Sequence, residues 1–85
     1  MLLFEVILEA GEGHVRLLSD ETLADTGAQE MTPEQAEKAG FHGIPEDPHG
    51  RERRFIACKH SSQGRILNAL EAHAAVAQFQ LHEVG

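Results

Sequence analysis

The residues best suited to bind a ligand lie just after the middle of the chain, at a predicted turn between a strand and a helix. Residues 59–65 read KHSSQGR and follow the apolar run at 55–58. The first N–H groups of a helix lack intrahelical partners and carry a partial positive charge, so anions bind there. The sequence therefore predicts a site for a small anionic ligand, built from Lys59, His60, Ser61, Ser62 and Arg65. In a simpler interpretation, the serines only cap the helix and the charged side chains are solvated.

The charge distribution sets this segment apart from the rest of the chain. The net charge is −7, yet residues 51–65 carry five of the seven basic side chains and only one acid. Arg53 and Arg54 are therefore expected to form a supporting cationic patch. The same basic block could instead pair with the protein's own acidic half or with a second subunit. The overall negative charge and the absence of tyrosine and tryptophan make nucleic-acid binding an unfavoured function.

Histidines and the single cysteine raise the possibility of a metal site. Cys58 and His60 are two residues apart on a predicted strand, so their side chains share a face, and His42 and His49 lie in one loop. Zinc and copper sites usually use closely spaced pairs such as CxxC or HxxxH, which are absent here. A metal-binding protein is therefore the alternative to the anion-binding interpretation, and Cys58 can equally pack as a small apolar residue.

Catalysis is the third possibility. Cys58 with a histidine could form a nucleophilic pair, but a reactive thiolate needs an exposed, electropositive setting and Cys58 lies in an apolar run. No carboxylate is placed by the sequence to orient a histidine. The pattern thus favours a protein that is not an enzyme and needs no cofactor, with a small enzyme as the second alternative.

Length and composition bound the architecture. The 85 residues form one domain, 1–85, and a single cysteine cannot form an intramolecular disulfide. Residues 1–8 lack the basic flank and cleavage site of a signal peptide, and no apolar run approaches the roughly 20 residues that span a bilayer. We therefore expect a soluble, cytoplasmic protein with no membrane partner.

The amino-terminal half predicts short elements. An apolar strand at 2–9 is followed by turn residues and then by a return strand at 14–18, although a helix at 14–25 competes with this hairpin. Ser19 is a plausible N-cap for one or two helical turns that stop at Gly27. Residues 32–35 form a capping box with proline in the first helical position, and 41–50 is a loop.

The carboxy-terminal half predicts strand, helix and strand. Residues 51–60 form a covered strand, a helix capped by Ser61 or Ser62 runs to 73–75, and 76–84 alternates with Ala77, Phe79 and Leu81 facing inward. Such a unit has parallel strands, with room for another strand between them.

These elements predict an α+β domain. We expect a mixed sheet of about four strands with the helices mainly on one face, of the ferredoxin-like or split βαβ type. An open edge at 76–84 would favour a homodimer. The function expected is that of a small regulatory or binding module that self-associates and binds a partner protein or a small anionic ligand at residues 59–65.

Overall fold

The computed structural model describes residues 2–12, 15–41 and 52–83. Their elements are the strands β1 (Leu2–Leu8), β2 (Gln29–Met31), β3 (Arg53–Cys58) and β4 (Val76–Glu83), the helices α1 (Asp20–Thr26), α2 (Pro33–Lys38) and α3 (Gln63–Ala72), and the 3₁₀ turn η1 (His60–Ser62). The chain is thus a small α+β domain.

The four strands form one antiparallel sheet in the order β2-β3-β1-β4. β3 and β4 both run antiparallel to β1, so they are parallel to each other with β1 between them. The expectation that another strand separates the strands of the β3-α3-β4 unit is confirmed. The expectation of a mixed sheet is wrong, because the insertion of β1 leaves no two parallel strands side by side.

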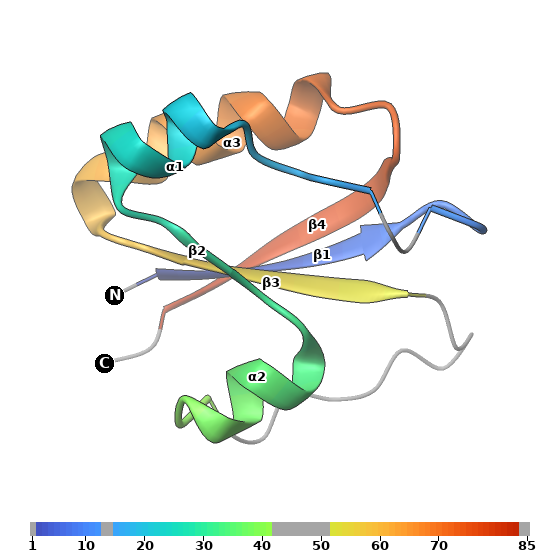
Figure 1. Cartoon of the computed structure of the whole chain (residues 1–85), viewed down its shortest axis with the longest axis horizontal. Helices are drawn as coiled ribbons and strands as arrows, with labels where there is room; N and C mark the ends of the chain where they lie inside the picture. The colour runs from blue at the N-terminus through green and yellow to red at the C-terminus, as the bar shows by residue number, and fades with distance from the viewer. Residues whose placement is uncertain (1, 13–14, 42–51, 84–85) are drawn as a thin grey trace.

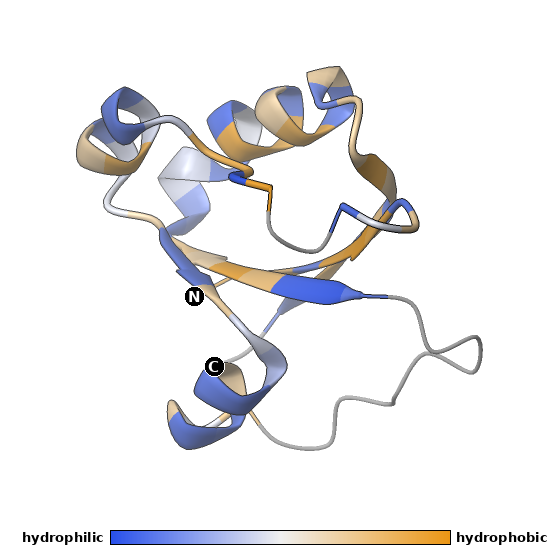
Figure 2. Ribbon diagram, turned by 45° about the vertical axis from the view of Figure 1, so that its right-hand side comes forward, coloured by the Kyte–Doolittle hydropathy of each residue, from blue (hydrophilic) through white to orange (hydrophobic). Residues whose placement is uncertain are grey.

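The two faces of the sheet carry separate apolar clusters. Helices α1 and α3 cover one face and α2 lies on the other (Figure 1). The larger cluster, under α1 and α3, includes Phe4, Ile56 and Leu70, while the smaller one, under α2, is built around Phe55 and Ala36. β3 is hydrophilic where it begins and apolar along the rest of its length (Figure 2), so its first residues are the polar part of an otherwise buried strand.

Two short helices begin and end where the sequence predicts. The Ser19 hydroxyl accepts a hydrogen bond from the Thr22 N–H at the start of α1, and Gly27 ends that helix with a φ of 67° that favours glycine. Thr32 and Gln35 form the full capping box of α2. Ala36 docks α2 onto the sheet.

The region between β1 and α1 differs from both predictions. Residues 15–18 form neither the return strand of a hairpin nor a helix, and His14 lies outside the described residues. Leu17 and Leu18 are nevertheless buried, because this irregular segment packs over the sheet in the cluster under α1 and α3. The strand at the sheet edge next to β3 is β2, which the sequence did not indicate.

β4 forms one edge of the described sheet. Its register places Phe79 opposite Val6 and Leu81 opposite Phe4, on the face that carries α1 and α3, as its alternation predicts. Burial is weaker than expected, since Phe79 is half-buried and Leu81 is exposed. In the described part of the chain, no helix has the length and apolar character needed to cross a membrane.

Candidate functional site

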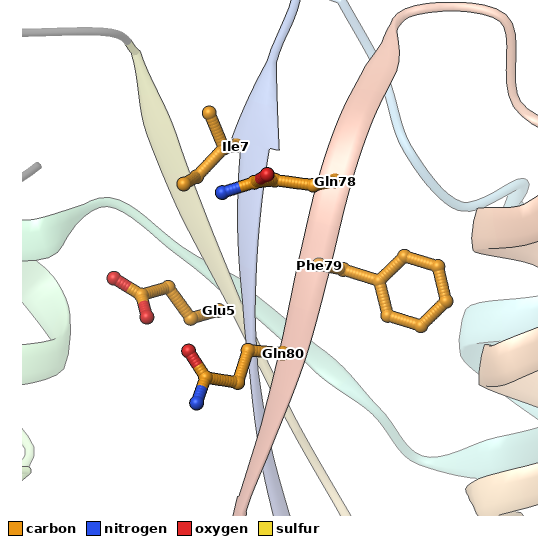
Figure 3. Close-up of a pocket in the computed structure, with 5 residues that line it drawn as sticks. All are labelled: Glu5, Ile7, Gln78, Phe79 and Gln80. Carbon is orange, nitrogen blue, oxygen red and sulfur yellow. The ribbon is translucent and has the colours of Figure 1, made fainter. Parts of the chain in front are cut away.

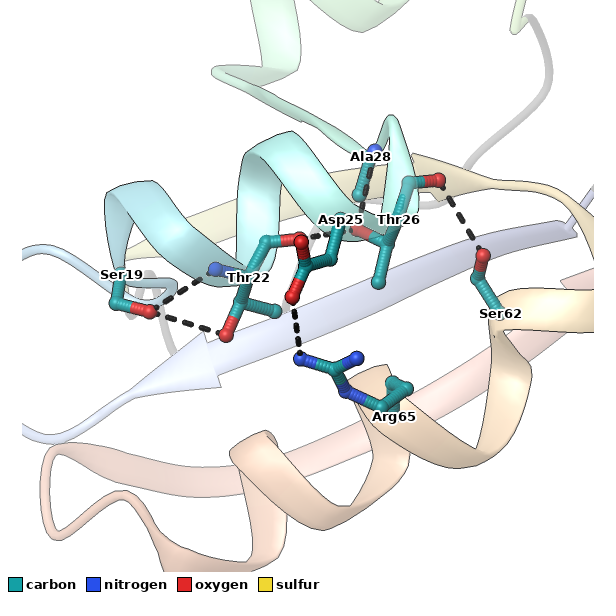
Figure 4. Close-up of polar contacts among 7 residues, drawn as sticks. All are labelled: Ser19, Thr22, Asp25, Thr26, Ala28, Ser62 and Arg65. Atoms are coloured by element: carbon teal, nitrogen blue, oxygen red, sulfur yellow. Dashed lines mark hydrogen bonds and ion pairs between the residues drawn. The ribbon is translucent and has the colours of Figure 1, made fainter.

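The serines of the 59–65 turn do not cap α3. Residues 60–62 of this turn form η1. Within the described residues, no side chain forms a capping hydrogen bond at the start of α3. Ser62 is buried, and its hydroxyl donates to the carbonyl oxygen of Thr26 at 3.3 Å (Figure 4). Ser62 therefore fastens the start of α3 to the end of α1, while Ser61 is exposed.

Lys59 of this turn is exposed, whereas Arg65 and His60 contact acids of the same chain. The Arg65 guanidinium lies 3.4 Å from the Asp25 carboxylate of α1 (Figure 4). The His60 ring lies 3.3 Å from the Glu83 carboxylate at the end of β4. Both contacts are exposed to solvent, where such pairs contribute little to stability. Their geometry agrees with the interpretation in which the basic block pairs with the protein's own acids.

Arg53 and Arg54 do not join that turn. They begin β3, whereas residues 59–65 follow its end. Neighbouring residues of a strand point to opposite faces, and the contacts follow this rule. Arg54 donates to the Val15 carbonyl at 3.1 Å and lies 3.8 Å from Glu30, whereas Arg53 pairs with Glu5 on the face that carries α2. The predicted cationic patch is thus divided between the two faces.

The predicted metal ligands are not brought together within the described residues. His42 and His49 lie outside those residues, and no group of three or more His, Cys, Asp or Glu side chains there could hold a metal ion. Cys58 is buried in the core, and this burial raises the pKa of its thiol above the ordinary value. A buried, protonated thiol is a poor nucleophile and a poor ligand.

A different set of polar side chains converges on the face that carries α2. Glu5, in the middle of β1, is only 9% exposed. Its Oε2 atom accepts a hydrogen bond from Arg53 of β3 at 2.9 Å, and its Oε1 atom lies 3.2 Å from the Nε2 atom of His82 on β4. We call Glu5, Arg53 and His82 the Glu5 network. A carboxylate removed from water needs such partners, because desolvation of an unpaired charge is costly.

Beside this network is a cavity of about 260 Å³ between β1 and β4. It is lined by Glu5, Ile7, Gln78, Phe79 and Gln80 (Figure 3). The two glutamine side chains lie on the same side of the sheet as Glu5 and Ile7, whereas the Phe79 ring points to the opposite side. The lining offers the amide donors and acceptors of the two glutamines beside the Glu5 carboxylate.

The sequence held one signal for this network. Glu5 is the only charged residue of the strand LLFEVIL, whose seven residues are all buried. A lone acid in such a strand needs hydrogen-bond donors or a cation as partners, but Arg53 and His82 are distant in sequence and only strand pairing brings them near.

Comparison with protein-family models, with curated proteins and with solved structures finds no match for the chain.

Proposed function

We propose that this domain is a non-enzymatic binding module that associates by pairing its β4 edge with a strand of a second polypeptide, which in the simplest case is another copy of the chain. The observation that carries the proposal is the edge itself. β4 has eight residues, VAQFQLHE, without proline and without Asp, Glu, Lys or Arg before Glu83. Edge strands present unpaired N–H and C=O groups, which monomeric proteins usually protect with charges, proline, bulges or short length.

The other edge strand of the described sheet provides the contrast. β2 has only three residues, and one of them is Glu30. It is short and partly charged, as protected edges are. In β4 the pairing with β1 is regular from Gln78 to Glu83, and the one irregularity falls near Val76. Most of β4 is therefore regularly paired, as a strand that accepts a further neighbour should be. Leu81 of this strand is 39% exposed, and among the described residues it is the exposed large apolar one.

Two features favour binding over catalysis. The only thiol is buried, and the buried carboxylate of Glu5 is held by Arg53. A buried, protonated thiol is a poor nucleophile, and the Arg53 guanidinium stabilises the ionised Glu5 carboxylate as a structural partner.

A ferredoxin-like arrangement is part of the proposal. The units β1-α1-β2 and β3-α3-β4 interleave, so that β3 separates the strands of the first unit and β1 those of the second. Helices α1 and α3 lie on the same face (Figure 1), and α2 is an addition between β2 and β3 on the other. This interleaving supports the split βαβ type.

A small anionic ligand at residues 59–65 receives less support. Such a ligand would compete with Asp25 for Arg65 and with Glu83 for His60, and the Ser62 hydroxyl is already used. Phosphate should raise the unfolding midpoint if this site exists, and Arg65→Ala should abolish the rise. An unchanged midpoint in excess phosphate would remove this alternative.

Amide hydrogen exchange of β4 tests the main proposal. An edge strand pairs on one side only, so alternate amides between Ala77 and Glu83 should exchange fast in the isolated chain. Pairing on the outer side should protect these amides as well, and the protection should increase with protein concentration. Fast alternate amides at the highest concentration, with light scattering at the mass of one chain, would overturn self-association through β4. Leu81→Lys should restore fast exchange, whereas Ala24→Lys, which adds the same charge at an exposed site on α1, should not.

A further inference from the structure

We infer that two copies of the chain pair their β4 strands antiparallel with Gln80 opposite Gln80 of the second copy. This inference rests on the proposed function and specifies its partner and its register. Dimers of identical chains are mostly two-fold symmetric, with the same patch on both sides. A two-fold axis that makes neighbouring strands antiparallel stands perpendicular to the sheet, so both copies keep α1 and α3 on the same face.

This symmetry restricts the possible registers. Residues opposite each other in an antiparallel pair point to the same face, and the faces of β4 alternate. Phe79 and Leu81 lie on the face of α1 and α3, and Gln78, Gln80 and His82 on the face of α2, by their partners on β1. The symmetric pairing must therefore be centred on a residue and cannot be centred between two residues.

Among these centres, Gln80 uses the regular part of the strand. A pairing centred there joins residues 77–83 of both copies and leaves out Val76, where the register with β1 is irregular. A centre at Phe79 would pair only residues 77–81 unless it included Val76, and a centre at Leu81 would pair only residues 79–83 and would place the Glu83 carboxylate opposite the Phe79 ring. The strand's own geometry thus favours Gln80.

The side chains of both faces fit this register. Phe79, which packs on Phe4 with ring centroids 6.2 Å apart, would lie opposite Leu81 of the second copy, and the pair occurs twice. This contact would cover the exposed Leu81 side chain. Both side chains are apolar, and removal of apolar surface from water favours association.

On the other face, the second copy would complete the cavity beside the Glu5 network. Gln78 would lie opposite His82 of the second copy, and the two Gln80 amides would meet at the axis, where each can donate to and accept from the other. The cavities of the two copies, each lined by Glu5, Ile7, Gln78 and Gln80, would then adjoin across the axis. The interface would contain no facing like charges, although each chain has a net charge of −7.

Cysteine cross-linking tests the register. Gln80→Cys should form an intermolecular disulfide rapidly, because directly opposite Cβ atoms lie about 4.5–5.5 Å apart. Gln78→Cys is the matched control, since Gln78 is an exposed glutamine on the same strand and face. In the Gln80 register the two copies of position 78 are offset by four residues, about 13 Å along the strand, so Gln78→Cys should cross-link at least about tenfold more slowly. The unmodified chain, whose Cys58 is buried, provides the baseline.

The outcomes separate the register from the proposed function. Faster cross-linking of Gln78→Cys, or slow cross-linking of both variants while the β4 amides are protected, overturns the register and leaves strand pairing in place. Slow cross-linking together with fast alternate amides overturns both. Circular dichroism of each variant verifies that the exposed substitutions leave the fold intact.

Discussion

Removal of the arginine from the Glu5 network should destabilise the domain strongly. In Arg53→Met the Glu5 carboxylate would lose its arginine and, among the described residues, would keep its contact with His82 on a face where it is almost fully covered. The side chains of Arg53 and Glu5 are 10% and 11% exposed, and their charged atoms are 2.9 Å apart. Breaking a buried ion pair by removal of one partner costs about 3–5 kcal/mol. Because both side chains retain some exposure and His82 remains, we expect a loss of about 3 kcal/mol.

This loss is large relative to the stability of a chain this size. A domain of 85 residues has a free energy of unfolding of about 4–13 kcal/mol. Urea denaturation followed by circular dichroism should therefore show a markedly lower midpoint with an unchanged slope. Arg16→Met is the control, because the ion pair of Arg16 with Asp20 has side chains that are 60% and 83% exposed. Such a surface pair should contribute less than about 0.5 kcal/mol.

A double-mutant cycle assigns the loss to the pair. Arg53 makes other contacts, including one with the Phe55 ring whose centroid lies 5.6 Å from its guanidinium carbon, so the single variant measures more than the ion pair. If the unpaired carboxylate is the main reason for the loss, the two substitutions should not be additive. The double variant Glu5→Leu/Arg53→Met should then lose at least about 1 kcal/mol less unfolding free energy than the two single variants lose together. Additive losses, or an Arg53→Met loss no greater than that of Arg16→Met, would refute the reasoning.

Three further predictions concern single side chains. Ser62→Ala should cost about 1 kcal/mol of unfolding free energy, because it leaves the buried Thr26 carbonyl without its donor, while Ser61→Ala should have no effect by the same measurement. Gly64→Ala should stabilise the domain by up to about 1 kcal/mol, because the site is helical and open, so its denaturation midpoint should increase. Burial raises the pKa of Cys58, so the unfolded chain ionises first as the pH rises past the ordinary thiol value of 9.0. Ionisation of Cys58 should therefore leave the stability unchanged below that pH and should lower it above that pH. The thermal unfolding midpoints of the unmodified chain and of Cys58→Ala should run in parallel below pH 9.0 and diverge above it. Parallel pH profiles would contradict this.

Local signals explain which elements the sequence could predict. The helices α1 and α2 begin and end at caps that involve residues within four positions of each other, such as Ser19 with Thr22 and Thr32 with Gln35. β2 had no comparable signal. It is three residues long with one buried apolar side chain, Met31, and it is a strand only because β3 is available to pair with it.

The start of α3 shows how tertiary contacts override a local preference. Serine before a helix favours capping, and both Ser61 and Ser62 are in position to cap. Ser62 instead donates to Thr26, which is 36 residues away, and the chain enters α3 through a 3₁₀ turn. Nothing near residue 62 in the sequence indicates that the end of α1 packs there.

The Glu5 network could not be predicted because its residues meet only through strand pairing. Arg53 and Arg54 are equivalent by sequence, and strand register alone places Arg53 on the face of Glu5 and Arg54 on the face of Glu30. A slip of one residue between β1 and β3 would exchange the faces. Arg54 would then lie on the face of Glu5, and Arg53 would replace Arg54 on the face of Glu30. Because each acid would have an arginine on its face in either register, the charges alone do not specify which arginine joins Glu5, and only the pairing of the folded sheet, with Arg53 opposite Ile7, decides it.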